Sequence, residues 1–300
     1  MADTRLLQLL PPIRRARDFR LYAEDGRRLV DLWQYGGAAL LGHTPPGLLR
    51  AFKNTAGRGL FAPLPGRLEG RVLRALAGFF PGRTFRLYGS GASLFRALAA
   101  GTPVSAVPPV SVPDPALPAW EPGFCSLWRP FLDFPGTDSG APETAAGKDA
   151  GPAAALPAAV AAFLAAIPLL VPVLPLPWTG APRILALDPA QVRVEAFPPS
   201  DIISPVYLAA AARALCDLKA ALPLRGVSFA GINRALHKSP WRRRGIYLVP
   251  GEVPGEAAYE KLFRRFLEGG FLLPPDRKLP AILPGALSAG EEAQLAALLF

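Results

Sequence analysis

Proline is the residue that most restricts how this chain can fold. The 300 residues include 36 prolines and 29 glycines. Because proline lacks a backbone N–H and clashes with the preceding helical turn, this density argues against a bundle of long helices and predicts many short elements joined by turns. Hydrophobic residues make up 51% of the chain, which is long enough to bury a substantial core. The sequence therefore predicts a folded protein of one large or two modest domains.

One stretch of the chain, residues 150–182, carries no charge and is long enough to cross a bilayer. It also contains seven prolines, which suit a membrane-spanning helix poorly. We therefore expect a buried helix at about 156–167 and a buried strand at about 168–176. The N-terminal residues show no signal-cleavage pattern, and two cysteines are too few for a disulfide framework. These features predict a cytoplasmic protein that does not enter a membrane.

Short strands and helices alternate along much of the chain. Residues 18–31 predict a hairpin, because the Asp-Gly pair within them favours a tight turn. Apolar residues at helical spacing predict helices at 67–80, 204–222 and 259–270. This alternation indicates an α/β or α+β fold.

Capping residues predict where three helices begin. Thr44 and Ser204 each precede a proline and are expected to be N-caps. Ser288 and Glu291 have the spacing of a capping box at the start of the last helix.

The chain is basic, with a formal net charge of +10. Such a charge is typical of proteins that bind nucleic acid or an anionic membrane, but no RNA-binding aromatic signature or zinc finger accompanies it. The dense cluster Arg242-Arg243-Arg244 adjoins an apolar run and is expected to be a solvated loop before a strand. A basic nucleic-acid or membrane-surface binder is therefore the third of three functions that we weigh, and neither partner is expected.

Few side chains suited to catalysis or metal binding are present. His43 and His237 are the two histidines, which argues against a His-rich metal centre, and no metal site is expected. We expect His43 to be a hydrogen-bonded structural residue and His237 to lie at the surface. Cys216 lies on an alanine-rich helix face and is predicted to be in the core, whereas Cys125 has no nearby partner base.

The segment 86–98, RLYGSGASLFRAL, has the pattern of a strand, a small-residue turn and a helix. Small residues let backbone N–H groups approach an anion, and a helix N-terminus adds a favourable dipole. The same pattern also serves plain packing. The sequence therefore leaves open whether this turn binds a phosphate.

Four segments, taken in order, resemble the class III aminotransferases of the pyridoxal-phosphate (PLP) fold-type-I superfamily, especially glutamate-1-semialdehyde aminomutases. The first, DGRRLVDLWQYGGAALLGHTPPGLLRAFKN, resembles the family's early hairpin and "GH-x-HP" motif; Gly42, His43 and Pro46 match it, and Pro45 replaces the second histidine. The third, SPVYLAAAARAL, resembles the "GNP" helix. The fourth, YEKLFRRFLEGGFLLPP with the residues after it, resembles the family's terminal subdomain.

The second segment, GSGASLFRAL, resembles "SG-[TA]-EA", whose backbone holds the cofactor phosphate in the family. Ser90, Gly91 and Ala92 match this motif, whereas Ser93 replaces its glutamate and Leu94 its alanine. The resemblance therefore implies that Ser90, Gly91 and Ala92 would bind the phosphate of PLP, if the cofactor binds.

The resemblance implies an α/β fold: a reduced PLP-dependent transferase (fold type I)-like large domain, with a small α+β domain built from the N- and C-terminal segments. The chain between the motifs is much shorter than in the family, so a full large domain is not expected. The implied ranges are 1–60 for the N-terminal part of the small domain, 61–222 for the shortened large domain with a proline-rich loop at 101–151, and 223–300 for the C-terminal small domain.

The lysine that a transaminase needs is absent from its expected place. In the resembled family a lysine forms an aldimine with the cofactor a few tens of residues before the "GNP" helix. Here Lys148 is followed by no lysine until Lys219. Arginine cannot replace it, because its guanidinium stays protonated. Asp188 ends an apolar strand, as the family's pyridine-binding aspartate does, so Asp188 and Lys219 remain a rearranged alternative; otherwise Lys219 is a solvated residue at a helix end.

The sequence thus predicts a shortened, degenerate relative of class III aminotransferases without transaminase chemistry. It would act as a binding or subunit-assembly protein, as a homodimer or paired with an intact relative, and a phosphate-bearing small molecule is a candidate ligand. The second function is an active PLP enzyme that uses Asp188 and Lys219.

Overall fold

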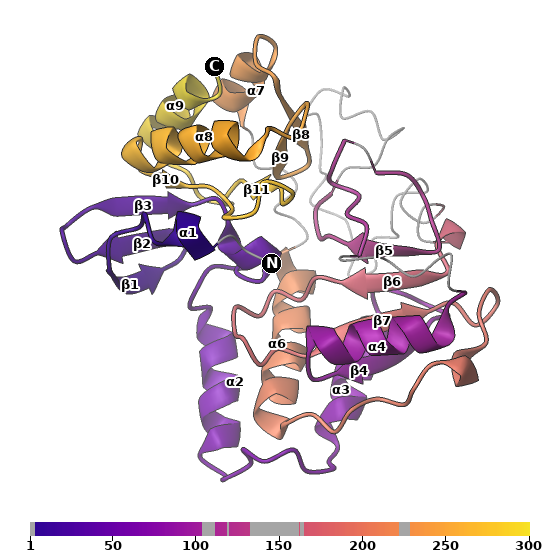
Figure 1. The fold of residues 1–300 in the computed structure, drawn as a ribbon. Helices are drawn as coiled ribbons and strands as arrows, with labels where there is room; N and C mark the ends of the chain where they lie inside the picture. The colour runs from indigo at the N-terminus through magenta and orange to yellow at the C-terminus, as the bar shows by residue number, and fades with distance from the viewer. Residues whose placement is uncertain (1–3, 104–111, 119, 133–161, 163–164, 222–228) are drawn as a thin grey trace, which may run out of the picture.

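Three β-sheets organise the part of the chain that the structure describes (Figure 1). The structure is a computed structural model, and it describes residues 4–103, 112–118, 120–132, 162, 165–221 and 229–300. Most of the predicted helix at 156–167 and most of the proline-rich loop at 101–151 lie outside these residues.

The central sheet has the strand order β4-β7-β6-β5. Strand β7 is antiparallel to both of its neighbours, whereas β5 and β6 are parallel. Strands β6 and β7 consist mainly of buried apolar residues, as expected for strands that are covered on both faces. The four strands are β4 (Thr84–Tyr88), β5 (Cys125–Trp128), β6 (Leu169–Pro172) and β7 (Arg183–Leu187).

Helices cover both faces of this sheet. Alternate residues of β7 point to opposite sides, so that Ile184 and Ala186 join one apolar cluster while Leu185 and Leu187 join another. The first cluster includes residues of three helices, α2 (Pro46–Ala56), α3 (Leu68–Ala77) and α6 (Pro205–Ala221). The second cluster includes residues of α4 (Gly91–Gly101), which lies across the sheet in Figure 1. It also includes Phe197, which directly follows the 3-10 helix η3 (Val194–Ala196).

Both ends of the chain build the second half of the molecule. The sheet β1-β2-β3-β10 joins an N-terminal meander to a C-terminal strand, because β3 pairs in parallel with β10. These strands are β1 (Ile13–Arg17), β2 (Arg20–Ala23), β3 (Arg28–Asp31) and β10 (Phe271–Leu272). The third sheet, in the order β11-β9-β8, contains β8 (Trp241–Arg244), β9 (Tyr247–Pro250) and β11 (Ala281–Ile282).

The remaining helices lie in this same half (Figure 1). They are α1 (Thr4–Leu7), α7 (Ala230–Leu236), α8 (Glu256–Glu268) and α9 (Ala289–Leu298). An ion pair fastens the N-terminal strands to α9: Arg20 donates to both carboxylate oxygens of Glu291, at 2.9 and 2.6 Å. This guanidinium and the backbone N–H of Ser288 hold the pKa of Glu291 at about 2, well below its usual value.

A buried ion pair connects the two halves. Arg129 donates to both carboxylate oxygens of Asp114, at 2.8 and 2.6 Å, and both side chains are almost completely buried. The same guanidinium donates to the Gly36 carbonyl at 2.9 Å and lies over the Tyr247 ring. The Tyr247 hydroxyl donates to the Pro130 carbonyl at 2.7 Å, so the N-terminal segment, the central sheet and the third sheet meet here.

Most of the sequence-based elements are confirmed, with bounds shifted by a few residues. The hairpin within 18–31 is the β2–β3 pair, and Gly26 in its turn has a φ of +86°. The helix expected at 67–80 is α3, and the helix expected at 259–270 is α8, which ends at Glu268 with Gly269 as its C-cap. The strand expected at 168–176 is the shorter, buried β6. The Ser288–Glu291 capping box is present in full.

Three local predictions are wrong. Helix α2 begins after Pro45 without a side-chain cap, so Thr44 does not cap it. The Ser204 hydroxyl has no hydrogen-bond partner among the described residues, so it does not cap α6. Arg242, Arg243 and Arg244 lie in strand β8 itself rather than in a loop before a strand, because their backbone pairs with β9 in an antiparallel register.

The domain boundaries stay predictions. Helix α2, which falls within the 1–60 segment, packs on α6 through the first apolar cluster. No helix in the described part of the chain is long and apolar enough to cross a membrane.

The Asp114→Ala variant should be destabilised by about 3–5 kcal/mol, because it leaves the Arg129 charge buried and unpaired. The free energy of unfolding in urea measures this loss. Asp217→Ala is the matched control, since it breaks the exposed Arg213–Asp217 pair and should cost less than about 1 kcal/mol. Equal losses in the two variants would contradict the role assigned to the buried pair.

Candidate functional site

The turn between β4 and α4 is the expected phosphate site, and its serine is engaged in capping. Ser90 is the N-cap of α4, and its hydroxyl accepts a hydrogen bond from the Ser93 N–H at 3.0 Å. This bond satisfies one of the free N–H groups at the helix start. A Cβ added at Gly91 would meet no atom within 4 Å, so no neighbouring atom requires a glycine there. Ala92 follows within the first turn of α4.

A carboxylate of the chain itself occupies this turn. Asp201 lies in the segment before α6, and its Oδ2 accepts a hydrogen bond from the Gly89 N–H at 2.8 Å. The Asp201 backbone is fixed as well, since its N–H donates to the Leu87 carbonyl at 2.8 Å. A phosphate brought to this turn would meet the negative charge of Asp201 at short range. The turn therefore does not fit the phosphate of PLP.

Asp188 and Lys219 are each engaged in their own surroundings. Asp188 follows β7, and its carboxylate accepts from the Ala190 N–H at 2.9 Å and from the Gln191 amide at 2.6 Å. These bonds, with the charge of Arg83, lower the pKa of Asp188 although partial burial acts in the opposite direction. Lys219 is exposed in the last turn of α6. Neither residue appears among the contacts of the other, so no described contact brings the two together.

His43 holds the segment after β3 in place. Its Nε2 lies 2.8 Å from Asp31 Oδ2, and its backbone N–H donates to the Asp18 carbonyl at 2.8 Å. The other oxygen of buried Asp31 accepts from the N–H groups of Trp33 and Gln34. The prediction of a structural histidine is confirmed, and His237 is exposed, as expected.

Asp31 also braces an unusual backbone. Four consecutive residues, Gln34 to Gly37, have positive φ angles, a conformation that non-glycine residues such as Gln34 and Tyr35 rarely adopt. The Arg129 guanidinium holds the same segment through the Gly36 carbonyl. Strain of this kind persists only where the surroundings impose it, and here a carboxylate and a guanidinium do so.

Neither the two cysteines nor the acidic residues that the structure describes form a further reactive centre. Cys125 is buried on β5, and burial raises the pKa of its thiol to about 12, which opposes formation of a nucleophilic thiolate. Cys216 was predicted to be in the core, but it is exposed, because it lies on the face of α6 turned away from the buried Leu215 and Leu218. Within the described ranges no three His, Cys, Asp or Glu side chains form a group able to hold a metal ion.

Comparison with known proteins places the chain in a family. No model of a known protein family matches it. It is 30% identical over 301 aligned residues to an uncharacterized protein of Treponema pallidum, and this match covers 91% of the chain and 88% of that protein. The chain belongs to the family of this Treponema pallidum protein. A second uncharacterized protein, from Borreliella burgdorferi, is 41% identical over 80 residues, which is 27% of the chain and 30% of that protein.

The chain has the fold of PLP-dependent aminotransferases. An omega-transaminase from Sphaerobacter thermophilus matches with a TM-score of 0.63 at 12% identity, over 99% of this chain and 94% of that one. Ornithine delta-aminotransferase from Plasmodium falciparum matches with a TM-score of 0.60 at 14% identity, over 99% and 95%. A glutamate-1-semialdehyde aminomutase from Pseudomonas aeruginosa gives 0.58 at 15% identity, over 96% and 86%. The predicted fold class is thus confirmed, and at these identities the likeness concerns the fold alone.

The sequence did not reveal the residues that decide the chemistry of the β4–α4 turn, nor those of the buried ion pair between the two halves. Asp201 follows two prolines and a serine, and nothing in that pattern indicates a bond to Gly89. Asp114 and Arg129 lie in or beside a proline-rich stretch, and no periodic pattern in the sequence indicates that they form an ion pair. Of these three residues, only Asp114 could have been singled out from the sequence, because it is a lone charged residue within a long apolar region.

Phosphate should not stabilise the native protein, whereas Asp201→Asn should gain binding at the turn because it removes the opposing charge. At about ten times the dissociation constant, the variant's melting temperature should rise by about 2 °C. Differential scanning fluorimetry with added phosphate measures the shift, and Asp217→Asn on α6 is the control. Stabilisation of the native protein that disappears in Gly91→Asp would show instead that the turn binds the anion despite Asp201.

Proposed function

We propose that this chain is a degenerate aminotransferase-like protein that lacks transaminase chemistry and acts as a binding or subunit-assembly protein. The observation that carries the proposal is the lysine-free stretch from residue 149 to residue 218. It contains every position at which the resemblance places the Schiff-base lysine. Asp201 supports the same conclusion independently, since its carboxylate is bonded to the N–H of Gly89, next to the residues that would bind the cofactor phosphate.

The two observations affect separate requirements of PLP chemistry. A transaminase needs a primary amine that can be uncharged, in order to attack the cofactor aldehyde and then to carry the substrate proton. Arginine side chains in this stretch, such as Arg183 and Arg193, keep their charge and cannot take that role. The cofactor also needs a phosphate anchor, and the turn at Gly89 offers its N–H to a carboxylate instead. Loss of either function alone would disable the site.

The alternative of an active PLP enzyme depends on Lys219 and Asp188, and no contact in the described residues favours it. Lys219 is exposed in the last turn of α6, so its amine is not desolvated by burial. Such a lysine is a weaker nucleophile than a desolvated one.

PLP added to the purified protein should therefore give no specific internal-aldimine absorbance, and borohydride should trap no adduct at one defined lysine. Absorbance spectra and peptide mass spectrometry after reduction measure this. Lys238→Ala, at another exposed lysine, is the control for Lys219→Ala. A stoichiometric adduct at Lys219, abolished by Lys219→Ala and retained in Lys238→Ala, would overturn the proposal.

The assembly role makes a second prediction. In the resembled family the active site forms at a dimer interface, and the motifs that this chain retains build the small domain and the turn. We infer that the chain is a homodimer or pairs with an intact relative. Sedimentation velocity should then show a species of about twice the 31.8 kDa chain mass. A single monomeric species at all concentrations, with no pairing when a PLP-containing relative is added, would contradict this inference.

A further inference from the structure

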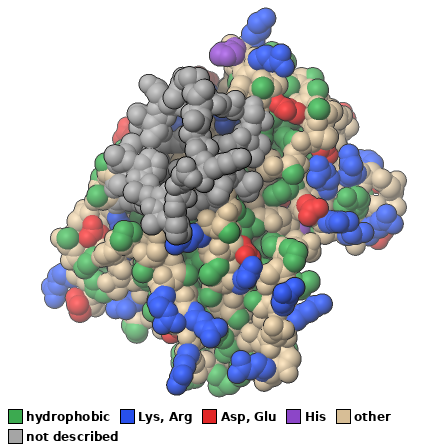
Figure 2. Space-filling view, turned by 180° about the vertical axis from the view of Figure 1, so that it is seen from behind, with side chains coloured by type: hydrophobic (Ala, Val, Ile, Leu, Met, Phe, Trp, Pro, Cys, Tyr) green, Lys and Arg blue, Asp and Glu red, His purple; other side chains and the backbone are tan. Residues whose placement is uncertain are grey.

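One end of the molecule is strongly basic. We call it the basic tip and define it as residues 46–77, which comprise α2, the connecting segment and α3. It carries six Lys and Arg residues and one acidic residue, Glu69. All six basic side chains are exposed, and Figure 2 shows blue side chains gathered over the lower end of the molecule, where α2 and α3 lie in Figure 1. The six are Arg50, Lys53, Arg58, Arg67, Arg71 and Arg74.

The helix periodicity directs these charges outward. Arg67, Arg71 and Arg74 follow one another at spacings of four and three residues, so they share one face at and beyond the start of α3. Val72 and Leu76 on the opposite face are buried in the first apolar cluster. The packing of α3 on α6 therefore leaves a row of arginines facing solvent.

None of the six cations is neutralised by a neighbour in the described part of the chain. Ion pairs there involve other basic residues, for example Arg20 with Glu291 and Arg213 with Asp217. Six unpaired charges in 32 residues of chain repel one another. A surface of opposite sign would relieve that repulsion.

Large apolar side chains are exposed among the charges. Phe61, Leu64 and Leu49 are 60%, 48% and 40% exposed, and every residue from 61 to 67 is exposed. Pro63 and Pro65 stiffen this segment, so Phe61 and Leu64 have little freedom to fold back onto the protein. Exposed large apolar residues ringed by polar ones mark a surface for interaction.

We propose that the basic tip docks on the surface of an anionic lipid bilayer. Lipid headgroup phosphates would neutralise the six cations, and Phe61 and Leu64 would enter the boundary between headgroups and acyl chains. This binding is peripheral, and it uses the side chains of a protruding end rather than a helix that crosses the membrane. It is independent of the proposed function, because none of these residues lies in the β4–α4 turn.

The charge pattern selects the bilayer over two other occupants. In a twofold dimer formed through this face, the basic tip of one copy would face the basic tip of the other. The six cations of each copy would then repel those of its partner. Nucleic acid would satisfy the cations, but its phosphates offer no apolar medium for Leu49 and Leu64. A bilayer supplies both the anions and the apolar layer.

Vesicle co-sedimentation of the full chain tests the proposal. Phosphatidylcholine vesicles containing phosphatidylglycerol should bind the protein, pure phosphatidylcholine vesicles should not, and raised salt should weaken binding. Phe61→Ser with Leu64→Ser should reduce the partition coefficient by at least about tenfold. The triple variant Arg67→Glu, Arg71→Glu, Arg74→Glu should reduce it by more than about a hundredfold, since each charge is worth about fivefold.

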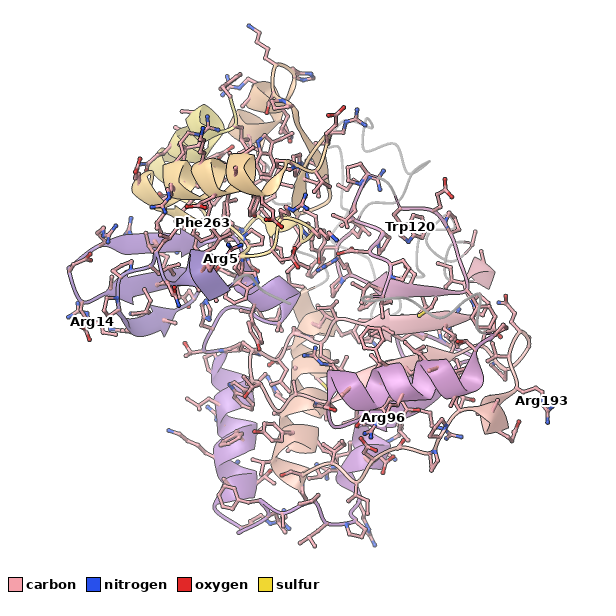
Figure 3. All side chains as sticks on the ribbon, viewed as in Figure 1. Arg5, Arg14, Arg96, Trp120, Arg193 and Phe263 are labelled. Atoms are coloured by element: carbon pink, nitrogen blue, oxygen red, sulfur yellow. The ribbon has the colours of Figure 1, made fainter. Side chains whose placement is uncertain are left out.

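The matched control changes three exposed basic residues outside the tip: Arg14→Glu, Lys238→Glu and Arg242→Glu. Figure 3 places Arg14 on the outer strand of the N-terminal sheet, away from α2 and α3. Both triple variants lower the net charge from +10 to about +4 (each Lys or Arg to Glu change removes two charges). The control should bind within about threefold of the native protein, and circular dichroism confirms that each variant is folded.

Three results would overturn the proposal. One is an absence of binding to the anionic vesicles by the folded native protein. Another is an equal loss of binding in both triple variants, which would mean that net charge alone attracts the protein. The third is that the protein binds no vesicles but behaves in one of two other ways. Either it binds duplex DNA tightly and the Phe61 and Leu64 substitutions leave that binding unchanged, or it forms a dimer that these substitutions dissociate.

Discussion

The pair formed by Asp114 and Arg129 is the contact on which the arrangement of the two halves depends. A buried guanidinium is stable only if its donors are satisfied, and here the carboxylate takes two of them and the Gly36 carbonyl a third. Those acceptors belong to different parts of the chain. Burial of the Arg129 charge therefore requires the N-terminal segment, the central sheet and Tyr247 to take one relative geometry. The left-handed run from Gln34 to Gly37 is held by the same network.

Polar groups of the chain satisfy one another at the place where the fold would accommodate a ligand. The Ser90 hydroxyl and the Asp201 carboxylate accept hydrogen bonds from the N–H groups of Ser93 and Gly89, so groups of the chain itself engage two of the donors at this turn. A single acidic side chain thus bonds to the strand–turn–helix and adds a negative charge beside it. The chain thus combines an aminotransferase fold with a carboxylate bonded at this turn.

The sequence predicted those parts of the molecule that depend on local patterns. Helical spacing located α3 and α8, the Asp-Gly pair located the β2–β3 turn, and Ser288 with Glu291 located the start of α9. Long-range polar partners were not predictable, because the bond from Gly89 to Asp201 joins residues whose spacing follows no period. Cys216 shows the same limit within a helix, since a small-residue face resembles a core face until the neighbouring helices are placed.

The parallel pairing of β3 with β10 has a consequence for how this protein is made. Strand β3 ends at residue 31, but its partner begins at residue 271, so about 240 residues are synthesised between the two. At ordinary rates of translation, that interval is on the order of tens of seconds. During this time the outer edge of β3 offers unpaired backbone groups to any other strand. The N-terminal meander therefore completes its sheet only once residues 271–272 have been synthesised, and a chain terminated before them retains an open edge that can nucleate aggregation.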